Sequence, residues 1–185
     1  NHADAHQDMG LTLYAMGKYP EAIEQFQAQL QARPNPLRSY NGLGAAYWAL
    51  GEDDKAQENY AQALRLDPDY PPANYGMGAV LFTRGRFEEA AVHFARTIER
   101  MPKHTEARGA LGRTLAILGR GSEAEPYLRQ VMSPDAAADL QAALGNVLAE
   151  TGRTNEATPY FEKARQKDPK LADQYLQQGK MYLAQ

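Results

Sequence analysis

Two histidines near the start of the sequence have the spacing of a metal site on one helical turn. His2 and His6 stand four residues apart, with Asp4 between them and Asp8 after them. Such a group could hold a divalent cation. A terminal turn, however, gives metal ligands no supporting shell of hydrogen bonds. We therefore expect no physiological metal site in this chain.

Two Gly-x-Gly segments resemble part of a phosphate-binding loop. The segments 42–44 and 76–78 read Gly-x-Gly, but neither follows a strand and the third glycine of a phosphate loop is missing. The chain contains no Gly-x-Ser-x-Gly elbow and no His-Glu-x-x-His segment. We expect no catalytic residue and no cofactor, so the chain is predicted not to be an enzyme.

Composition narrows the classes of partner. The net charge is −3 and the isoelectric point about 5.8. The chain therefore lacks the excess of basic residues that is typical of nucleic-acid-binding proteins. No run approaches 18 apolar residues, so direct membrane insertion is not expected and the chain is predicted to be soluble. The absence of cysteine suits a bacterial periplasm, but the cytoplasm stays open.

The sequence is built from a repeat of about 34 residues. One glycine series recurs every 34 residues, with a single interval of 33: Gly10, Gly44, Gly78, Gly112, Gly145 and Gly179. A second series follows each of the first five by seven residues: Gly17, Gly51, Gly85, Gly119 and Gly152. Each unit has apolar residues at 3.6-residue spacing on both sides of the second glycine, which predicts two amphipathic helices joined by a short turn.

The second unit shows how the sequence specifies such a hairpin. Its predicted helices run over residues 40–50 and 55–66, and Gly51 suits the left-handed end of the first. Gly44 lets two helix backbones approach closely, and Tyr60 is predicted to fill the volume behind that crossing. A single hairpin cannot bury its own apolar faces, so neighbouring units must stack.

This pattern resembles the tetratricopeptide repeat family. The closest correspondence is Leu43-Gly44-Ala45-Ala46-Tyr47, followed by Gly51, Ala56, Tyr60, Ala63 and Pro68. The resemblance implies an all-α fold, a right-handed superhelical solenoid of antiparallel helix hairpins. A single repeat domain over 1–185 is predicted, with units 3–36, 37–70, 71–104, 105–137 and 138–171 and a terminal helix over 172–185.

In similar proteins the first helix of each unit lines a concave groove. Counting in that register, the twelfth position holds three aromatics and then two alanines, and the fifth and ninth positions add amide and basic groups. The predicted peptide-binding residues are Tyr14, Asn41, Trp48, Tyr75, Phe82, Arg113 and Asn146. Trp48, the only tryptophan, is the leading anchor residue, because large amphipathic side chains dominate binding energy.

The predicted function is a non-catalytic scaffold that binds a protein or peptide in its concave groove. One alternative is that these repeats are the substrate-recruiting arm of a larger enzyme, such as a transferase. A second alternative is a self-assembling scaffold, a homo-oligomer formed through uncapped ends, since Gly179, Tyr182 and Leu183 lie where another unit's packing surface would begin.

Overall fold

The computed structural model describes residues 2–32, 36–133 and 135–170, and this part of the chain is all-helical. Ten helices follow one another: α1 His2–Ala15, α2 Tyr19–Ala32, α3 Leu37–Ala49, α4 Asp53–Leu66, α5 Pro71–Thr83, α6 Phe87–Arg100, α7 Thr105–Ile117, α8 Gly121–Val131, α9 Ala138–Glu150 and α10 Thr154–Lys167. The all-α prediction is confirmed. The predicted terminal helix over 172–185 lies outside the described residues.

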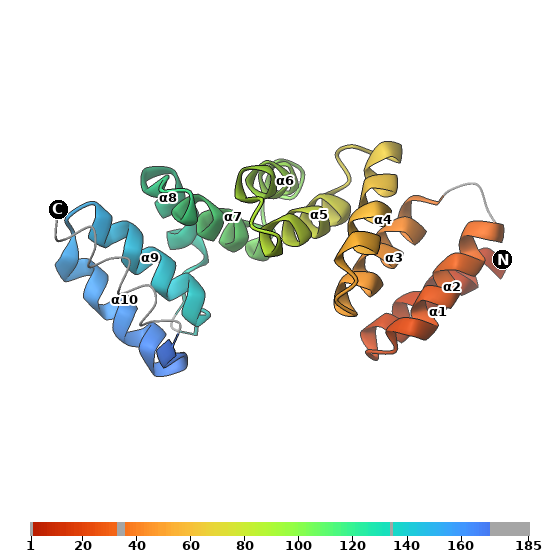
Figure 1. Ribbon diagram of the computed structural model, residues 1–185, viewed down its shortest axis with the longest axis horizontal. Helices are drawn as coiled ribbons and strands as arrows, with labels where there is room; N and C mark the ends of the chain where they lie inside the picture. Colours follow the sequence, from red (N-terminus) through yellow and green to blue (C-terminus); the bar gives the residue numbers. More distant parts are fainter. Residues whose placement is uncertain (1, 33–35, 134, 171–185) are drawn as a thin grey trace. The chain divides into compact units, whose positions relative to one another are not determined.

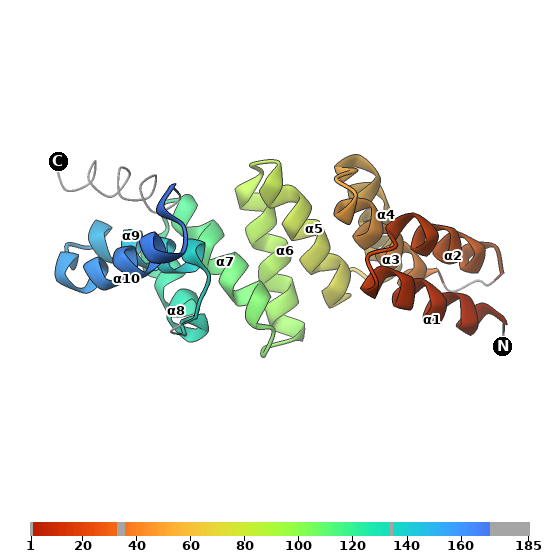
Figure 2. The same cartoon turned by 90° about the horizontal axis from the view of Figure 1, so that it is seen from below.

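The helices form two compact units, each described here by itself. Unit 1 comprises Asn1–Arg86 and Arg96–Pro102, and unit 2 comprises Phe87–Ala95 and Lys103–Gln185. The predicted single repeat domain stays a prediction. In unit 1, α1 packs on α2 and α3 on α4, while α1, α3 and α5 contact one another in sequence order. In unit 2, α7 packs on α8, α9 on α10, and α7 on α9. Figure 1 shows α1 beside α2 and α9 beside α10, and Figure 2 shows α3 with α4.

Glycine in α3 and α5 makes room for one buried aromatic ring. Tyr60 on α4 is 3% exposed. A Cβ added to Gly44 would lie 2.7 Å from Tyr60 Cδ1, and one added to Gly76 would lie 2.2 Å from Tyr60 Cζ. The ring is therefore held between its own hairpin and the next. Burial of a large apolar side chain contributes roughly 1.5–3 kcal/mol, so Gly44 supports packing within the hairpin and Gly76 supports the contact with the next one.

The same arrangement recurs one hairpin earlier. Phe26 on α2 is buried and lies against Gly10 of its own hairpin and Gly42 of the next. The Gly-x-Gly segment at 42–44 thus contacts two successive aromatic rings, with Gly42 facing Phe26 and Gly44 facing Tyr60. Packing between repeats, rather than phosphate binding, explains why this segment needs two glycines.

The α3–α4 turn ends α3 in a defined way. Gly51 has a φ of 76°, in the left-handed region that L-residues with a side chain rarely adopt. The Gly51 N–H donates to the Trp48 carbonyl and the Glu52 N–H to the Tyr47 carbonyl, both at 2.9 Å, which is a Schellman motif. The predicted glycine cap is confirmed, and it fixes Trp48 in the last turn of α3.

Two buried amides tie a first helix to the loop before it. Asn74 Nδ2 donates to the Pro68 carbonyl at 2.9 Å and to the Tyr70 carbonyl at 3.2 Å. In unit 2, Gln141 Nε2 donates to the Ser133 carbonyl at 3.2 Å. These side-chain hydrogen bonds hold carbonyls of the preceding loop against the first turn of the helix, so they help to set where α5 and α9 begin.

Candidate peptide-binding faces

Trp48 is the most exposed aromatic among the predicted site residues. Leu43 and Ala46 on the same helix are 3% and 0% exposed, whereas Trp48 is 37% exposed. The packing face of α3 is thus covered, and the indole lies on a face that no neighbouring helix fully covers. An exposed tryptophan next to a buried helix face is a common feature of binding surfaces.

Asn41 lies two helical turns before Trp48 on α3. Seven residues of α-helix span about 10.5 Å, and residues at i and i+7 share a face. Asn41 Oδ1 is shielded from solvent, yet no donor among the described residues reaches it. An unsatisfied buried acceptor is costly, so a rotation of the side chain that brings this oxygen to the surface would let a ligand N–H satisfy it.

Tyr14 is less available than the sequence suggests. It packs against the core formed by Ala22, Ile23 and Phe26 with the residues of α3, and its ring lies 5.4 Å from that of Tyr19. Burial, reinforced by Tyr19, raises the pKa of the Tyr14 phenol. Tyr14 therefore contributes to the stability of the first hairpin, and only part of its side chain stays exposed on α1.

Tyr75 and Phe82 lie on α5, seven residues apart, and both are half-buried. Together with Tyr14, Asn41 and Trp48 they belong to unit 1, whose first helices contact one another in the order α1, α3, α5. Unit 1 thus carries five of the seven predicted residues on three adjacent helices.

The other two predicted residues belong to unit 2. Arg113 on α7 forms an ion pair with Asp139 on α9, and both side chains are largely covered, at 29% and 26% exposed. Asn146 on α9 is 7% exposed. Arg113 was predicted to line the peptide-binding groove, and in the structure its guanidinium meets a carboxylate of its own chain.

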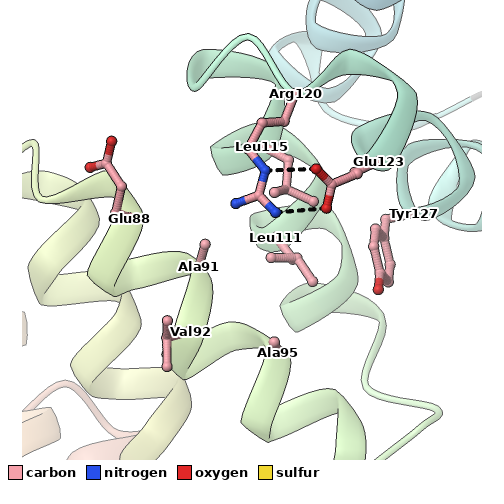
Figure 3. A pocket seen from close by; sticks show the side chains of 9 residues that line it. All are labelled: Glu88, Ala91, Val92, Ala95, Leu111, Leu115, Arg120, Glu123 and Tyr127. Carbon is pink, nitrogen blue, oxygen red and sulfur yellow. Dashed lines mark hydrogen bonds and ion pairs between the residues drawn. The ribbon is translucent and has the colours of Figure 1, made fainter.

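A hollow in unit 2 was not predicted (Figure 3). Its volume is about 220 Å³, and its lining comes from the start of α6, from α7 and from the α8 region. Leu111 and Leu115 form its apolar floor, and Val92 at its edge is 51% exposed. The full lining is Glu88, Ala91, Val92, Ala95, Leu111, Leu115, Arg120, Glu123 and Tyr127.

The charged part of this hollow is an ion pair at the start of α8. Arg120 Nε donates to Glu123 Oε1 at 2.8 Å, and Arg120 Nη2 donates to Glu123 Oε2 at 2.6 Å. The pair lowers the pKa of Glu123. Figure 3 shows this ion pair next to Leu115 and Leu111, with Glu88 on the facing helix. This pair was not predicted from the sequence.

Family models described as tetratricopeptide repeat match residues 1–69, 54–96, 81–147 and 138–167. The chain belongs to the tetratricopeptide repeat family. Repeats of this family are generally non-catalytic protein-interaction scaffolds, and the helical hairpins of this chain support that role. No curated protein matches the chain in sequence.

Several solved structures share the tetratricopeptide fold with this chain. A mutant of MamA is 23% identical, with a TM-score of 0.75, over 90% of this chain and 98% of that one. Another MamA structure, MSR-1, is 22% identical, with a TM-score of 0.71, over 91% and 98%. TTC0263, a thermophilic tetratricopeptide repeat protein of Thermus thermophilus, is 22% identical, with a TM-score of 0.62, over 99% and 100%.

The described residues contain no group of three or more His, Cys, Asp or Glu side chains placed to hold a metal ion. Within the same ranges, every helix is too short or too polar to cross a membrane.

Proposed function

We propose that this tetratricopeptide repeat protein binds a peptide segment of a protein partner on the face of α1, α3 and α5 in unit 1, and that its role is binding rather than catalysis. The residues proposed to contact the peptide are Tyr14, Asn41, Trp48, Tyr75 and Phe82. The proposal does not depend on Arg113 and Asn146, which belong to unit 2.

The observation that carries this proposal is the exposure of Trp48. At 37% exposed, the indole has apolar surface that a peptide side chain can cover, while its backbone is held by the Schellman motif at Gly51. A rigid aromatic anchor loses little conformational entropy on binding. Trp48 is therefore the residue whose loss should weaken binding most.

Asn41 is the residue proposed to accept a hydrogen bond from the backbone of the bound peptide. Its Oδ1 is shielded and accepts no hydrogen bond from the described residues, and it shares a helix face with Trp48. A peptide that covers the indole and donates one backbone N–H to Asn41 gains an apolar contact and a fixed orientation. Such a combination is typical of peptide-binding grooves.

A random peptide library displayed on phage provides a direct test. Peptides selected on the immobilised chain would be synthesised, and their affinity measured by the fluorescence of Trp48, the single tryptophan, and by calorimetry for variants without it. We expect Trp48→Ala to weaken binding by at least about tenfold, the size of a typical hot-spot loss. Asn41→Ala should weaken it less.

The matched control is Leu66→Ala. Leu66 is 51% exposed at the end of α4, so this variant also removes an exposed apolar side chain of unit 1, away from the α1, α3 and α5 face. Equal affinity of the wild-type chain and Trp48→Ala, at equal helicity by circular dichroism, would refute the proposal. A library that yields no peptide with saturable binding would refute it as well.

A further inference from the structure

The hollow in unit 2 differs from the equivalent place one repeat later. In the repeat register, Ala91 and Ala95 on α6 correspond to Glu125 and Arg129 on α8. The facing residues are alike in the two repeats: Leu111 and Leu115 correspond to Leu144 and Leu148, Arg120 to Arg153, Glu123 to Glu156, and Tyr127 to Tyr160. The two places thus have the same residues on one side. On the other side, the hollow has two alanines, whereas the equivalent place has Glu125 and Arg129.

The second place is bridged by those long side chains. The Glu125 carboxylate accepts from Arg153 Nη1 at 2.9 Å and from Nη2 at 2.5 Å. Arg129 Nη2 donates to Glu156 Oε2 at 3.1 Å. At these register positions, Arg153 therefore binds a carboxylate and Glu156 binds a guanidinium. Both groups come from α8, the second helix of the neighbouring hairpin.

The first place lacks these groups. Ala91 and Ala95 reach neither Arg120 nor Glu123, so the hollow stays open, and Arg120 bonds to Glu123 through two parallel hydrogen bonds. Glu88 adds a second carboxylate where the next repeat has Ser122. Glu88 is exposed and has no ion pair among the described residues. Two carboxylates and one guanidinium leave the hollow with an excess of negative charge.

This charge selects between two kinds of occupant. An acidic side chain could pair only with Arg120 Nη1, since Glu123 accepts from Nε and Nη2; it would then share one guanidinium with Glu123 and meet Glu88 as a further like charge. A basic side chain can pair with the exposed Glu88 without breaking the Arg120–Glu123 pair, and its apolar neighbour can cover Leu111, Leu115 and the exposed Val92. Charge complementarity thus favours a basic occupant over an acidic one.

We propose that the hollow between the start of α6, α7 and α8 is a second docking site, which binds a segment of a protein partner carrying a basic residue beside a large apolar one. The basic group pairs with Glu88 at the edge of the hollow (Figure 3), and the apolar side chain lies over Leu111 and Leu115. This site is independent of the α1, α3 and α5 face, because every residue that forms it belongs to unit 2.

The experiment uses a designed probe on the complete chain. An end-blocked, fluorescein-labelled helical peptide with leucine and arginine at i,i+4 spacing would be titrated with the protein and followed by fluorescence anisotropy. The matched peptide carries glutamate in place of each arginine. We expect saturable binding of the arginine peptide, weakened by added salt, and at least about tenfold weaker binding of the glutamate peptide.

Substitutions in the hollow test whether the arginine peptide binds there. Ala91→Glu with Ala95→Arg fills the hollow with the residues that the next repeat carries there and leaves the net charge unchanged. We expect this variant to bind the arginine peptide at least about tenfold more weakly. Glu88→Lys, an exposed single substitution, should also weaken binding. Asn155→Glu with Gln166→Arg, two exposed positions on α10, makes the same change of charge away from the hollow and should bind as the wild type does.

Three results would overturn the proposal: no saturable binding of the arginine peptide, equal binding of the two peptides, or wild-type affinity in the hollow variants. Circular dichroism melting of each variant accompanies the titrations. Should the Ala91→Glu, Ala95→Arg chain fail to fold, Glu88→Lys decides the question, since this exposed substitution leaves the packing of α6 intact.

Discussion

Glu125 on α8 and Arg153 at the start of α10 are joined by two parallel hydrogen bonds, Oε1 to Nη1 at 2.9 Å and Oε2 to Nη2 at 2.5 Å. Arg129 Nε donates to the same carboxylate at 2.8 Å. These hydrogen bonds, the one from Arg153 above all, lower the pKa of Glu125 from its usual value near 4.5 to about 2. The carboxylate thus connects two hairpins of unit 2.

Glu125→Gln should destabilise the protein at neutral pH but much less in acid. Because the pKa is lower in the folded state, the stabilisation is fully present above about pH 4.5 and is lost as the pH falls through about 2. Since both arginines are partly exposed, we expect about 1 kcal/mol at pH 7. Urea unfolding at pH 7, 4 and 2 measures this difference.

Glu162→Gln is the control for that series, because Glu162 is an exposed carboxylate on α10 that forms no ion pair among the described residues. A loss of stability in Glu125→Gln that is the same at pH 7 and pH 2 would contradict the ionic explanation.

Gly76→Ala should destabilise unit 1 although alanine favours helices. The helix preference contributes about 1 kcal/mol in favour of alanine, but the new Cβ would lie 2.2 Å from Tyr60 Cζ. Overpacking of this kind costs roughly 1–3 kcal/mol. Thermal unfolding should therefore show a lower Tm for the variant than for the wild type.

The Tyr60→Leu background tests the cause, since α8 carries Leu128 at the equivalent position. There the cost of Gly76→Ala should shrink by more than 0.5 kcal/mol, roughly the size of coupling between contacting residues. Equal costs in both backgrounds would rule out the ring as the cause.

Gly51→Ala should destabilise the α3–α4 hairpin through backbone conformation alone. A Cβ at Gly51 would have no heavy atom within 4 Å, but φ is 76°. A left-handed conformation costs an L-residue about 1–2 kcal/mol. Gly51→Asn should cost less, because asparagine tolerates this region better. Urea unfolding of both variants measures the order, and equal stability of the two would contradict the conformational explanation.

Glu150→Gln should stabilise unit 2 at neutral pH. Burial raises the pKa of Glu150, and its Oε2 lies 3.1 Å from the point where a Cβ at Gly121 would be. With the folded pKa above the unfolded one, stability is greatest below the unfolded pKa and is lost as the pH rises through the folded pKa. The Tm of the variant should exceed that of the wild type at pH 7 and equal it near pH 4. A lower Tm at pH 7 would contradict this.

The hairpins were predictable because their signals are local. Gly51 must adopt its positive φ whatever surrounds it, and Gly44 with Tyr60 lies within one hairpin, so their contact follows from the period alone. Trp48 was predicted as an anchor from its register, and the structure adds its exposure. The contact of Gly42 with Phe26 and the ion pair of Arg113 with Asp139 join different hairpins, and their partners cannot be read from one repeat.

The sequence by itself determined the repeat, the helical class and the place of each turn, because periodicity and glycine conformation act within a few residues along the chain. Only the tertiary structure decided which first-helix residues stay exposed and where a hollow opens. That outcome depends on side chains of neighbouring repeats. Glu125 and Arg129 bridge to α10 and close their site, whereas Ala91 and Ala95 are too short to reach across. One place is therefore filled by the protein itself, and the other stays open.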